Sequence, residues 1–389
     1  MVWYWTSTWE TSKYEAVSIK VNHFLGMYII CRKSNLSRLI KKLNKFFPDE
    51  YNFYPKSWVT PVDMHDLREF VASKKHAPLL ICKPEASWQG RGIFLTKKLD
   101  DVPKEKIFVV QEYLKNPCLI NQFKFDLRIY VLVTWWDPLR IYLYKDGLAR
   151  FATEKYKPII NTNSKKKNRF MHLTNYAVNK RNKNYCQGDE EDDEDSHKRS
   201  VLSILESLKE DEGADIDKIW QGIREITVKT ILGVQPELSH IYKAWHPSDK
   251  IGGMCFEVLG FDIILDKNYR PWLLEVNNSP SYNTDSPLDR KIKSELFHTT
   301  FKMLGISQND KKIVKTMEKL EYEKRGHRPE IEQQQKDLER SMFYQKVLED
   351  KIKTETNNIG LYEKVFPCED ESRMKSYNAI LAKAKSKYF

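Results

Sequence analysis

Apolar residues recur at two spacings along the chain, and these spacings predict where helices and strands form. In the segment SNLSRLIKKLNKFF, apolar side chains return every three or four residues, as they do on one face of a helix. Ser34 is a suitable N-cap for this helix and Pro48 is a suitable stop. Together with the aromatic segment before it, the helix predicts a small α/β domain over residues 1–60.

Apolar runs of strand length follow, separated by polar or glycine-containing joints. Residues 61–120 contain APLLICKP, RGIFLT and KIFVVQEYL, which predict a first α/β lobe. Residues 121–305 predict a second, larger lobe, in which a helix at 215–234 accompanies the strands FDLRIYVLVTWW, LRIYLYKDGLARFA, CFEVLGFDIIL and PWLLEVN. Beyond residue 306 apolar residues are sparse among Lys, Glu, Gln and Arg, so residues 306–389 are predicted to form a basic helical extension.

The composition is that of a globular protein with an excess of positive charge. Of 389 residues, 41% are hydrophobic and the formal net charge is +11. This charge predicts attraction to a polyanion and leaves nucleic acid, an anionic membrane and an acidic protein surface open. No apolar run reaches the ~18 residues of a membrane span, and no secretory signal is visible at the start. The six cysteines include no CxxC pair, so we expect reduced thiols in the cytosol and neither disulfides nor zinc.

Two apolar strands joined by a short polar turn carry the first candidate site. If the turn centres between Asn268 and Tyr269, antiparallel pairing places Asp262 opposite Glu275. Glu275 and Asn277 then share one strand face, because side chains alternate along a strand. Two carboxylates buried side by side are costly without a cation, and hard oxygen ligands of this kind suit Mg²⁺. The alternative is that these acids pair with a nearby Lys or Arg.

A second group of charged residues fits a phosphate-binding cleft. Lys83 ends an apolar strand and precedes a polar, glycine-containing loop, whose backbone N–H groups can approach phosphates. Lys124, Asp126 and Arg128 alternate in FKFDLRIY, which places three charges on one strand face. Neither a GxxxxGK[ST] sequence nor an HRD…DFG pairing is present, which disfavours a P-loop NTPase and a protein kinase.

A series of motifs resembles, in order, the tubulin tyrosine ligase-like family: KPEASWQGRGIF, QEYL, KFDLRIYVLV, GLARFA, MHLTNYAVNK, GFDIILD and LLEVNNSPS. The resemblance runs from VWYWT near the start to residue 305, and it implies an ATP-grasp fold in which two α/β lobes hold ATP between two sheets. VNHFLGMYIICRK and DPLRIYLYKDGLARFATEKY look most like the polyglutamylase branch. KTETNNIGLYEKVFP resembles the extra helical microtubule-binding module of that branch.

The resemblance implies a role for each matched position. The residues expected to bind ATP are Lys83, Gln89, Gly90, Gln111, Glu112, Tyr113, Leu114, Lys124, Asp126, Thr174 and Asn175. Those expected to hold free L-glutamate are Arg150, Tyr176 and Lys198, and those expected to bind Mg²⁺ are Asp262, Glu275 and Asn277. Lys83, Arg128 and Arg150 are the expected catalytic residues, while Gln89 and Asn278 are expected to contact the tubulin tail.

Some of these residues also have simpler interpretations. The alternative for Tyr113 and Leu114 is a place in the core, and the alternative for Arg150 is a structural ion pair. The alternative for Lys198 is a solvated loop, because it follows the acidic run 189–195.

Two departures from the family pattern bear on function. Ser87 and Trp88 stand where the family often has Gly and a small residue, which predicts a stiffer phosphate loop. Asn278 stands where polyglutamylases that lengthen chains tend to have His, which leaves the choice between starting and extending a branch open.

The expected function is that of an ATP-dependent tubulin polyglutamylase. It would ligate free L-glutamate to glutamate carboxylates of acidic tubulin C-terminal tails through an acyl-phosphate intermediate, with ATP and Mg²⁺ as cofactors. A monomer acting on α/β-tubulin in the cytoplasm and cytoskeleton, including the cilium, axoneme or basal body, is expected, with no nucleic acid or membrane as partner. The alternatives are a tubulin glycylase or tyrosine ligase on the same scaffold, an inactive microtubule-binding protein, and a nucleic-acid binder suggested only by the pI of about 9.0.

Overall fold

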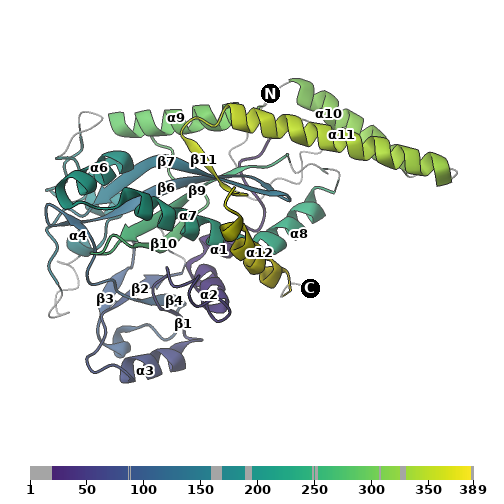
Figure 1. Ribbon diagram of the computed structural model, residues 1–389. Coiled ribbons are helices and arrows are strands. Elements are labelled where there is room, and N and C mark those ends of the chain that lie inside the picture. Colours follow the sequence, from purple (N-terminus) through teal and green to yellow (C-terminus); the bar gives the residue numbers. More distant parts are fainter. Residues whose placement is uncertain are drawn as a thin grey trace.

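This computed structural model describes residues 20–85, 87, 89–158, 169–188, 195–247, 249, 253–305, 308–324 and 330–386. The opening aromatic segment, Trp88 and residues 189–194 of the acidic run lie outside this part of the chain. Two antiparallel sheets dominate the fold, one of four strands and one of seven (Figure 1).

The smaller sheet forms a lobe of its own, seen at the bottom of Figure 1. Its strands lie in the order β1-β4-β2-β3, with bounds β1 Ser57–Thr60, β2 Leu80–Pro84, β3 Phe94–Thr96 and β4 Phe108–Glu112. Helix α3 (Met64–Ala72) and the short 3₁₀ helix η2 (Leu99–Asp101) accompany it. Trp58, Leu67 and Val110 belong to its apolar core. The three strands predicted within residues 61–120 are therefore confirmed as β2, β3 and β4.

The predicted domain over residues 1–60 does not exist as a separate unit among the described residues. Strand β1 joins the smaller sheet, whereas helices α1 (Tyr28–Cys31) and α2 (Lys33–Asn44) bury their apolar faces in the core of the larger sheet. The N-cap of α2 is Arg32 rather than Ser34. Ser34 lies in the first turn, where its backbone N and Oγ donate to the Glu85 carboxylate at 2.9 and 2.8 Å.

The larger sheet runs β10-β9-β6-β7-β11, with β5 paired to β6 and β8 paired to β7. The strands are β5 Leu119–Ile120, β6 Phe123–Trp136, β7 Leu139–Phe151, β8 Lys198–Ser200, β9 Glu257–Leu265, β10 Pro271–Asn277 and β11 Tyr362–Phe366. The helices that surround it are α4 Arg169–His172, α5 Tyr176–Asn179, α6 Val201–Glu212, α7 Ile216–Leu232, α8 Gln235–Trp245 and α9 Pro287–Leu304. Strands β6, β7, β9 and β10 and helix α7 confirm the elements predicted between residues 121 and 305.

Alternation along β6 gives the larger sheet two different faces. Ile129 and Val131 share a core with α6, α7 and α8, whereas Tyr130 and Leu132 share one with α9. Lys124, Asp126 and Arg128 fall on the same face as Tyr130, because side chains two apart point the same way. This face is therefore apolar under α9 and charged at the end of β6 that faces the smaller lobe.

The C-terminal part departs from the helical extension predicted for residues 306–389. Helices α10 (Gln308–Lys324) and α11 (Glu330–Asn357) pack together around Met317 and Val347, and Trp135 of β6 joins their core. After them, however, β11 pairs with β7, and α12 (Glu371–Lys385) packs on α7 and α8. Tyr377 and Ile380 are buried in the main core. The last 30 or so residues therefore belong to the main body of the fold. They cover the edge of β7 and an apolar side of α7, which would otherwise be exposed to water. Among the described helices, none is both long and apolar enough to cross a membrane.

Candidate active site

A cleft opens between the two sheets, and the boundary between two lobes is a common place for small-molecule sites. Strands from both sheets line it, and most of the residues predicted to bind a nucleotide meet there. These are Lys83, Gln111, Glu112, Tyr113, Leu114, Lys124, Asp126, Thr174 and Asn175, together with Asp262 and Glu275. Their sequence positions are far apart, so the fold alone brings them together.

On the smaller sheet, Lys83 is held in place by a neighbouring strand. Its Nζ donates to Gln111 Oε1 at 2.8 Å, and Gln111 Nε2 donates to Ser57 Oγ at 2.9 Å. Burial lowers the pKa of Lys83 to about 8. The nearby Glu275 and Asp262 carboxylates offset this burial only in part, so an anionic ligand such as a phosphate would stabilise the ammonium group further.

A second buried lysine reaches the cleft from the larger sheet. Lys124 Nζ donates to the Tyr113 hydroxyl at 3.0 Å and to the His172 carbonyl at 2.9 Å, and burial lowers the pKa of Lys124 to about 7. Tyr113 is buried as a core residue would be, and it also lines the cleft; its role in binding a nucleotide stays a prediction. His172, which sequence reasoning missed, lies 2.9 Å from the Tyr113 hydroxyl through Nδ1. Its place in the motif MHLTN was the only available signal.

Four charges from three neighbouring strands form a network on the open face of the larger sheet. Arg128 faces Asp262 across β6 and β9 and binds it through Nε–Oδ1 at 2.5 Å and Nη2–Oδ2 at 3.0 Å. Arg150 faces Asp126 across β7 and β6, binds its carboxylate in a forked pair, and also reaches Asp262 Oδ2 at 2.8 Å. Burial would raise the pKa of Asp262, but the two guanidinium groups hold it well below its usual range. Asp262 therefore does pair with arginine, as the alternative interpretation held.

The β9–β10 hairpin confirms that Glu275 lies opposite Asp262. The strand register that produces this pairing differs from the predicted one. Next to the turn, Pro271 faces Leu265, a register that would set Asp262 opposite Leu274. A β-bulge between Leu273 and Glu275 shifts the pairing by one residue and turns Glu275 toward the cleft.

The acidic end of the hairpin fits a divalent cation. Burial and the neighbouring Asp262 carboxylate raise the pKa of Glu275. The protein therefore does not fully offset the cost of the negative charge on Glu275. Asn277 donates Nδ2 to the Gly260 carbonyl at 3.3 Å, which leaves its Oδ1 out of this bond. Two carboxylates and an amide oxygen are ligands that Mg²⁺ accepts, and a cation here would offset the repulsion between Asp262 and Glu275.

The three residues predicted to hold an amino acid also lie together. Lys198 on β8 is the cross-strand neighbour of Arg150 on β7, and its Nζ lies 4.4 Å from the centre of the Tyr176 ring. Tyr185 packs edge-on against Tyr176, with ring centres 5.8 Å apart. The interpretation of Lys198 as a solvated loop residue is wrong: its side chain is 12% exposed and its Nζ lies 2.5 Å from Asp289 Oδ2.

The loop after β2 places its glycine against the site. Gly90 has φ +71°, and a β-carbon there would lie 2.9 Å from Asn175 Oδ1, so only glycine allows this approach. Lys33 Nζ donates to the Ser87 carbonyl at 2.7 Å, which ties the loop to α2. Gln89 is exposed on this loop, and Asn278 is half-buried just after β10; neither lines the cleft.

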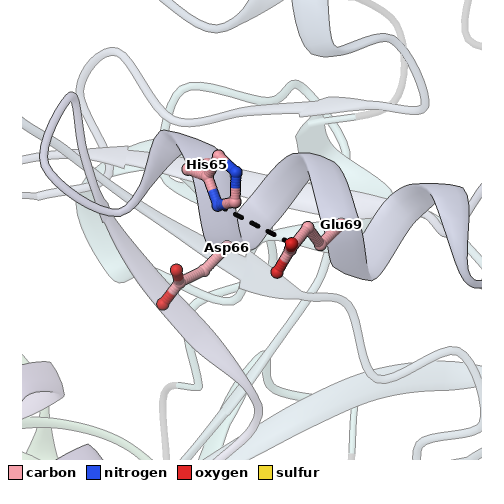
Figure 2. A group of neighbouring side chains, drawn as sticks. All are labelled: His65, Asp66 and Glu69. Atoms are coloured by element: carbon pink, nitrogen blue, oxygen red, sulfur yellow. Dashed lines mark ion pairs between the residues drawn. The ribbon is translucent and has the colours of Figure 1, made fainter.

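A different group of potential metal ligands, His65, Asp66 and Glu69, lies on α3 in the smaller lobe (Figure 2). All three are exposed, and Asp66 already pairs with Lys41 at 2.9 Å. The group therefore resembles an ordinary charged helix surface, on which side chains four residues apart meet.

Comparison with known proteins agrees with this geometry. The model of the tubulin-tyrosine ligase family matches residues 11–314. A probable beta-tubulin polyglutamylase of Tetrahymena thermophila is 43% identical over 90% of this chain and 29% of its own length. Tubulin polyglutamylase ttll6 of Danio rerio is 38% identical over 92% of this chain and 45% of its own, and tubulin polyglutamylase TTLL13 of Mus musculus is 39% identical over 91% and 43%. The chain thus spans less than half the length of these relatives. Since the family model covers most of the chain, the protein belongs to the tubulin-tyrosine ligase family.

Proposed function

We propose that this chain acts as an ATP-dependent tubulin polyglutamylase, which joins free L-glutamate to glutamate carboxylates of acidic tubulin tails. The observation that carries this proposal is that two candidate sites, one for a nucleotide and one for an amino acid, lie next to each other on the larger sheet. The cleft between the sheets holds the lysines suited to a nucleotide, and Arg150 is the strand neighbour of Lys198, whose ammonium group lies over the Tyr176 ring. Relatives named as tubulin polyglutamylases support the same activity.

In this proposal the two lobes act as an ATP-grasp fold. Lys83 and Lys124 would contact phosphates, while Glu112, Tyr113 and Leu114, at the end of β4, would meet the base. Thr174 and Asn175 close the cleft from the α4–α5 side. Asp262, Glu275 and Asn277 would hold Mg²⁺, which supplies charge neutralisation for the nucleotide's phosphates when bound.

The chemistry that these residues support is amide formation by way of an acyl phosphate. The acceptor carboxylate attacks the γ-phosphorus of ATP, ADP leaves, and an acyl phosphate forms. The α-amine of glutamate then attacks the acyl carbon, the carbon–oxygen bond to phosphate breaks, and the amine proton passes to water. Lys83 and Arg128 would stabilise the charge that develops on the phosphoryl oxygens, and Arg150 would orient the incoming carboxylate.

The partner in this proposal is the acidic C-terminal tail of α/β-tubulin in microtubules. The net charge of +11 favours encounter with an acidic chain. Helices α10 and α11 would add a second contact with the lattice and raise affinity through effective concentration. We place this activity in the cytoplasm and cytoskeleton, including the cilium.

The test is incubation of the protein with microtubules, Mg²⁺, ATP and labelled glutamate, glycine or tyrosine in turn. We expect ATP-dependent incorporation of glutamate into tubulin tails, seen by mass spectrometry as additions of glutamyl residues. Incorporation of glycine or tyrosine in preference to glutamate would replace the proposal with another ligase activity. Microtubule binding without incorporation of any of the three would leave only a binding protein.

A further inference from the structure

Asp289, near the start of helix α9, joins two lysines beside the predicted amino-acid pocket. Its Oδ2 lies 2.5 Å from Lys198 Nζ and its Oδ1 lies 2.6 Å from Lys293 Nζ. Asp289 is 1% exposed, and Ser286, the N-cap of the helix, donates its hydroxyl to the same carboxylate at 2.9 Å. The carboxylate is therefore fixed in position, and it fixes the ammonium group of Lys198 over the Tyr176 ring.

The charges of this group do not cancel. Lys198 and Asp289 alone would form a neutral pair with little attraction for an anion. Lys293 adds a second cation to the same carboxylate and leaves one positive charge in excess. Lys293 is 4% exposed and also bonds to the Asn283 carbonyl, so its own ammonium group is not presented to a ligand.

The neighbouring charges in the same sheet are balanced. Arg128 and Arg150 are matched by Asp126 and Asp262, with which they form the network described above. The exposed Lys180 and Asp285 also act on Tyr176 and add one charge of each sign, so the excess of positive charge beside Tyr176 comes from the buried Lys293. A ligand there would gain from a second negative charge in addition to the α-carboxylate that every free amino acid carries.

We propose that Lys293 is a positioning and specificity-determining residue: acting through Asp289, it keeps Lys198 available to bind the side-chain carboxylate of a dicarboxylic amino acid. This inference rests on the proposed ligase function and narrows its substrate class. Glycine, tyrosine and glutamine lack the second carboxylate and would not use the extra charge.

The experiment compares glutamate with its uncharged isostere glutamine as the incoming amino acid. Steady-state KM and kcat are measured with a tail peptide, ATP and Mg²⁺ for the wild type, Lys293→Met, Lys293→Arg and the exposed control Lys302→Met on the same helix. In Lys293→Met we expect the KM for glutamate to rise about tenfold, the preference for glutamate over glutamine to fall by a similar factor, and the KM for ATP to stay unchanged. Lys293→Arg should restore the preference, and Lys302→Met should match the wild type.

A second substitution separates charge from structure. Adding Asp289→Asn to Lys293→Met removes the carboxylate that would otherwise neutralise Lys198, so the pocket regains one positive charge. We expect the double variant to prefer glutamate over glutamine more strongly than Lys293→Met alone, with thermal unfolding used to confirm that each variant is folded. The inference is overturned if the double variant discriminates no better than the single one, or if Lys293→Met raises the KM values for glutamate and ATP together. A wild type that incorporates no amino acid would instead refute the proposed function.

Discussion

Replacing Glu275 with glutamine should affect stability and activity in opposite directions. The glutamine keeps the size of the side chain and removes one charge from the facing pair Asp262 and Glu275. The two carboxylates lie within hydrogen-bonding reach of each other. At an effective dielectric constant of about 20, two like charges about 4 Å apart repel by about 4 kcal/mol.

The arginines on Asp262 offset part of this repulsion. We therefore expect Glu275→Gln to raise the free energy of unfolding by about 1–3 kcal/mol in metal-free buffer at pH 7, or the melting temperature by about 1–4 °C for a chain of this size. The pH dependence has a definite sign. Because burial and Asp262 raise the pKa of Glu275, the wild type loses stability as pH rises from the unfolded-state pKa through the folded-state pKa. The gain of the variant should thus be absent below about pH 4 and should grow as pH rises through the folded-state pKa of Glu275.

Calorimetry with EDTA, followed by titration with Mg²⁺ and ATP, measures both effects. The wild type should gain stability from the ligands, whereas Glu275→Gln should gain little and should lose glutamate ligation. The exposed variant Glu206→Gln serves as the control for loss of an acid and should behave as the wild type. A metal-free melting temperature below that of the wild type, or near-normal ligation at saturating Mg²⁺ and ATP, would refute the reasoning.

Three further predictions address the other parts of the site. Arg150→Lys should raise the KM for glutamate at least tenfold and the KM for ATP much less, because lysine lacks the forked guanidinium; equal rises in steady-state assays would remove Arg150 from the amino-acid pocket. Charge reversal on the exposed side of α10 should weaken microtubule co-sedimentation about tenfold at low salt and flatten its salt dependence, yet spare activity on a free tail peptide; parallel loss of peptide activity would place α10 in the catalytic body. The substitutions are Lys312→Glu, Lys315→Glu and Lys319→Glu. Asn278→His should change the ratio of new branches to lengthened branches severalfold, and mass spectrometry of unmodified and pre-glutamylated peptides would reveal an unchanged ratio if Asn278 has no role.

Local patterns in the sequence were sufficient to predict several parts of this protein. A period of two along FKFDLRIY set Lys124, Asp126 and Arg128 on one face, and that face does line or border the cleft. The pairing of Asp262 with Glu275 followed from the turn between their strands, although the structure reaches it through a bulge. Such predictions succeed because strand geometry and short turns involve only neighbouring residues.

Contacts between distant segments were decided only in the folded chain. Residues 362–366 were predicted to belong to a helical extension, but they form β11 of the larger sheet. Without the C-terminal segment, the edge of β7 and an apolar side of α7 would be exposed to water. Asp289 and Lys293 gave no signal in sequence, since each becomes meaningful only beside Lys198. Strand periodicity was enough to predict which residues share a strand face. Which charges meet, and what net charge remains, depended on the folded chain, because an electrostatic interaction depends on separation and burial rather than on order along the chain.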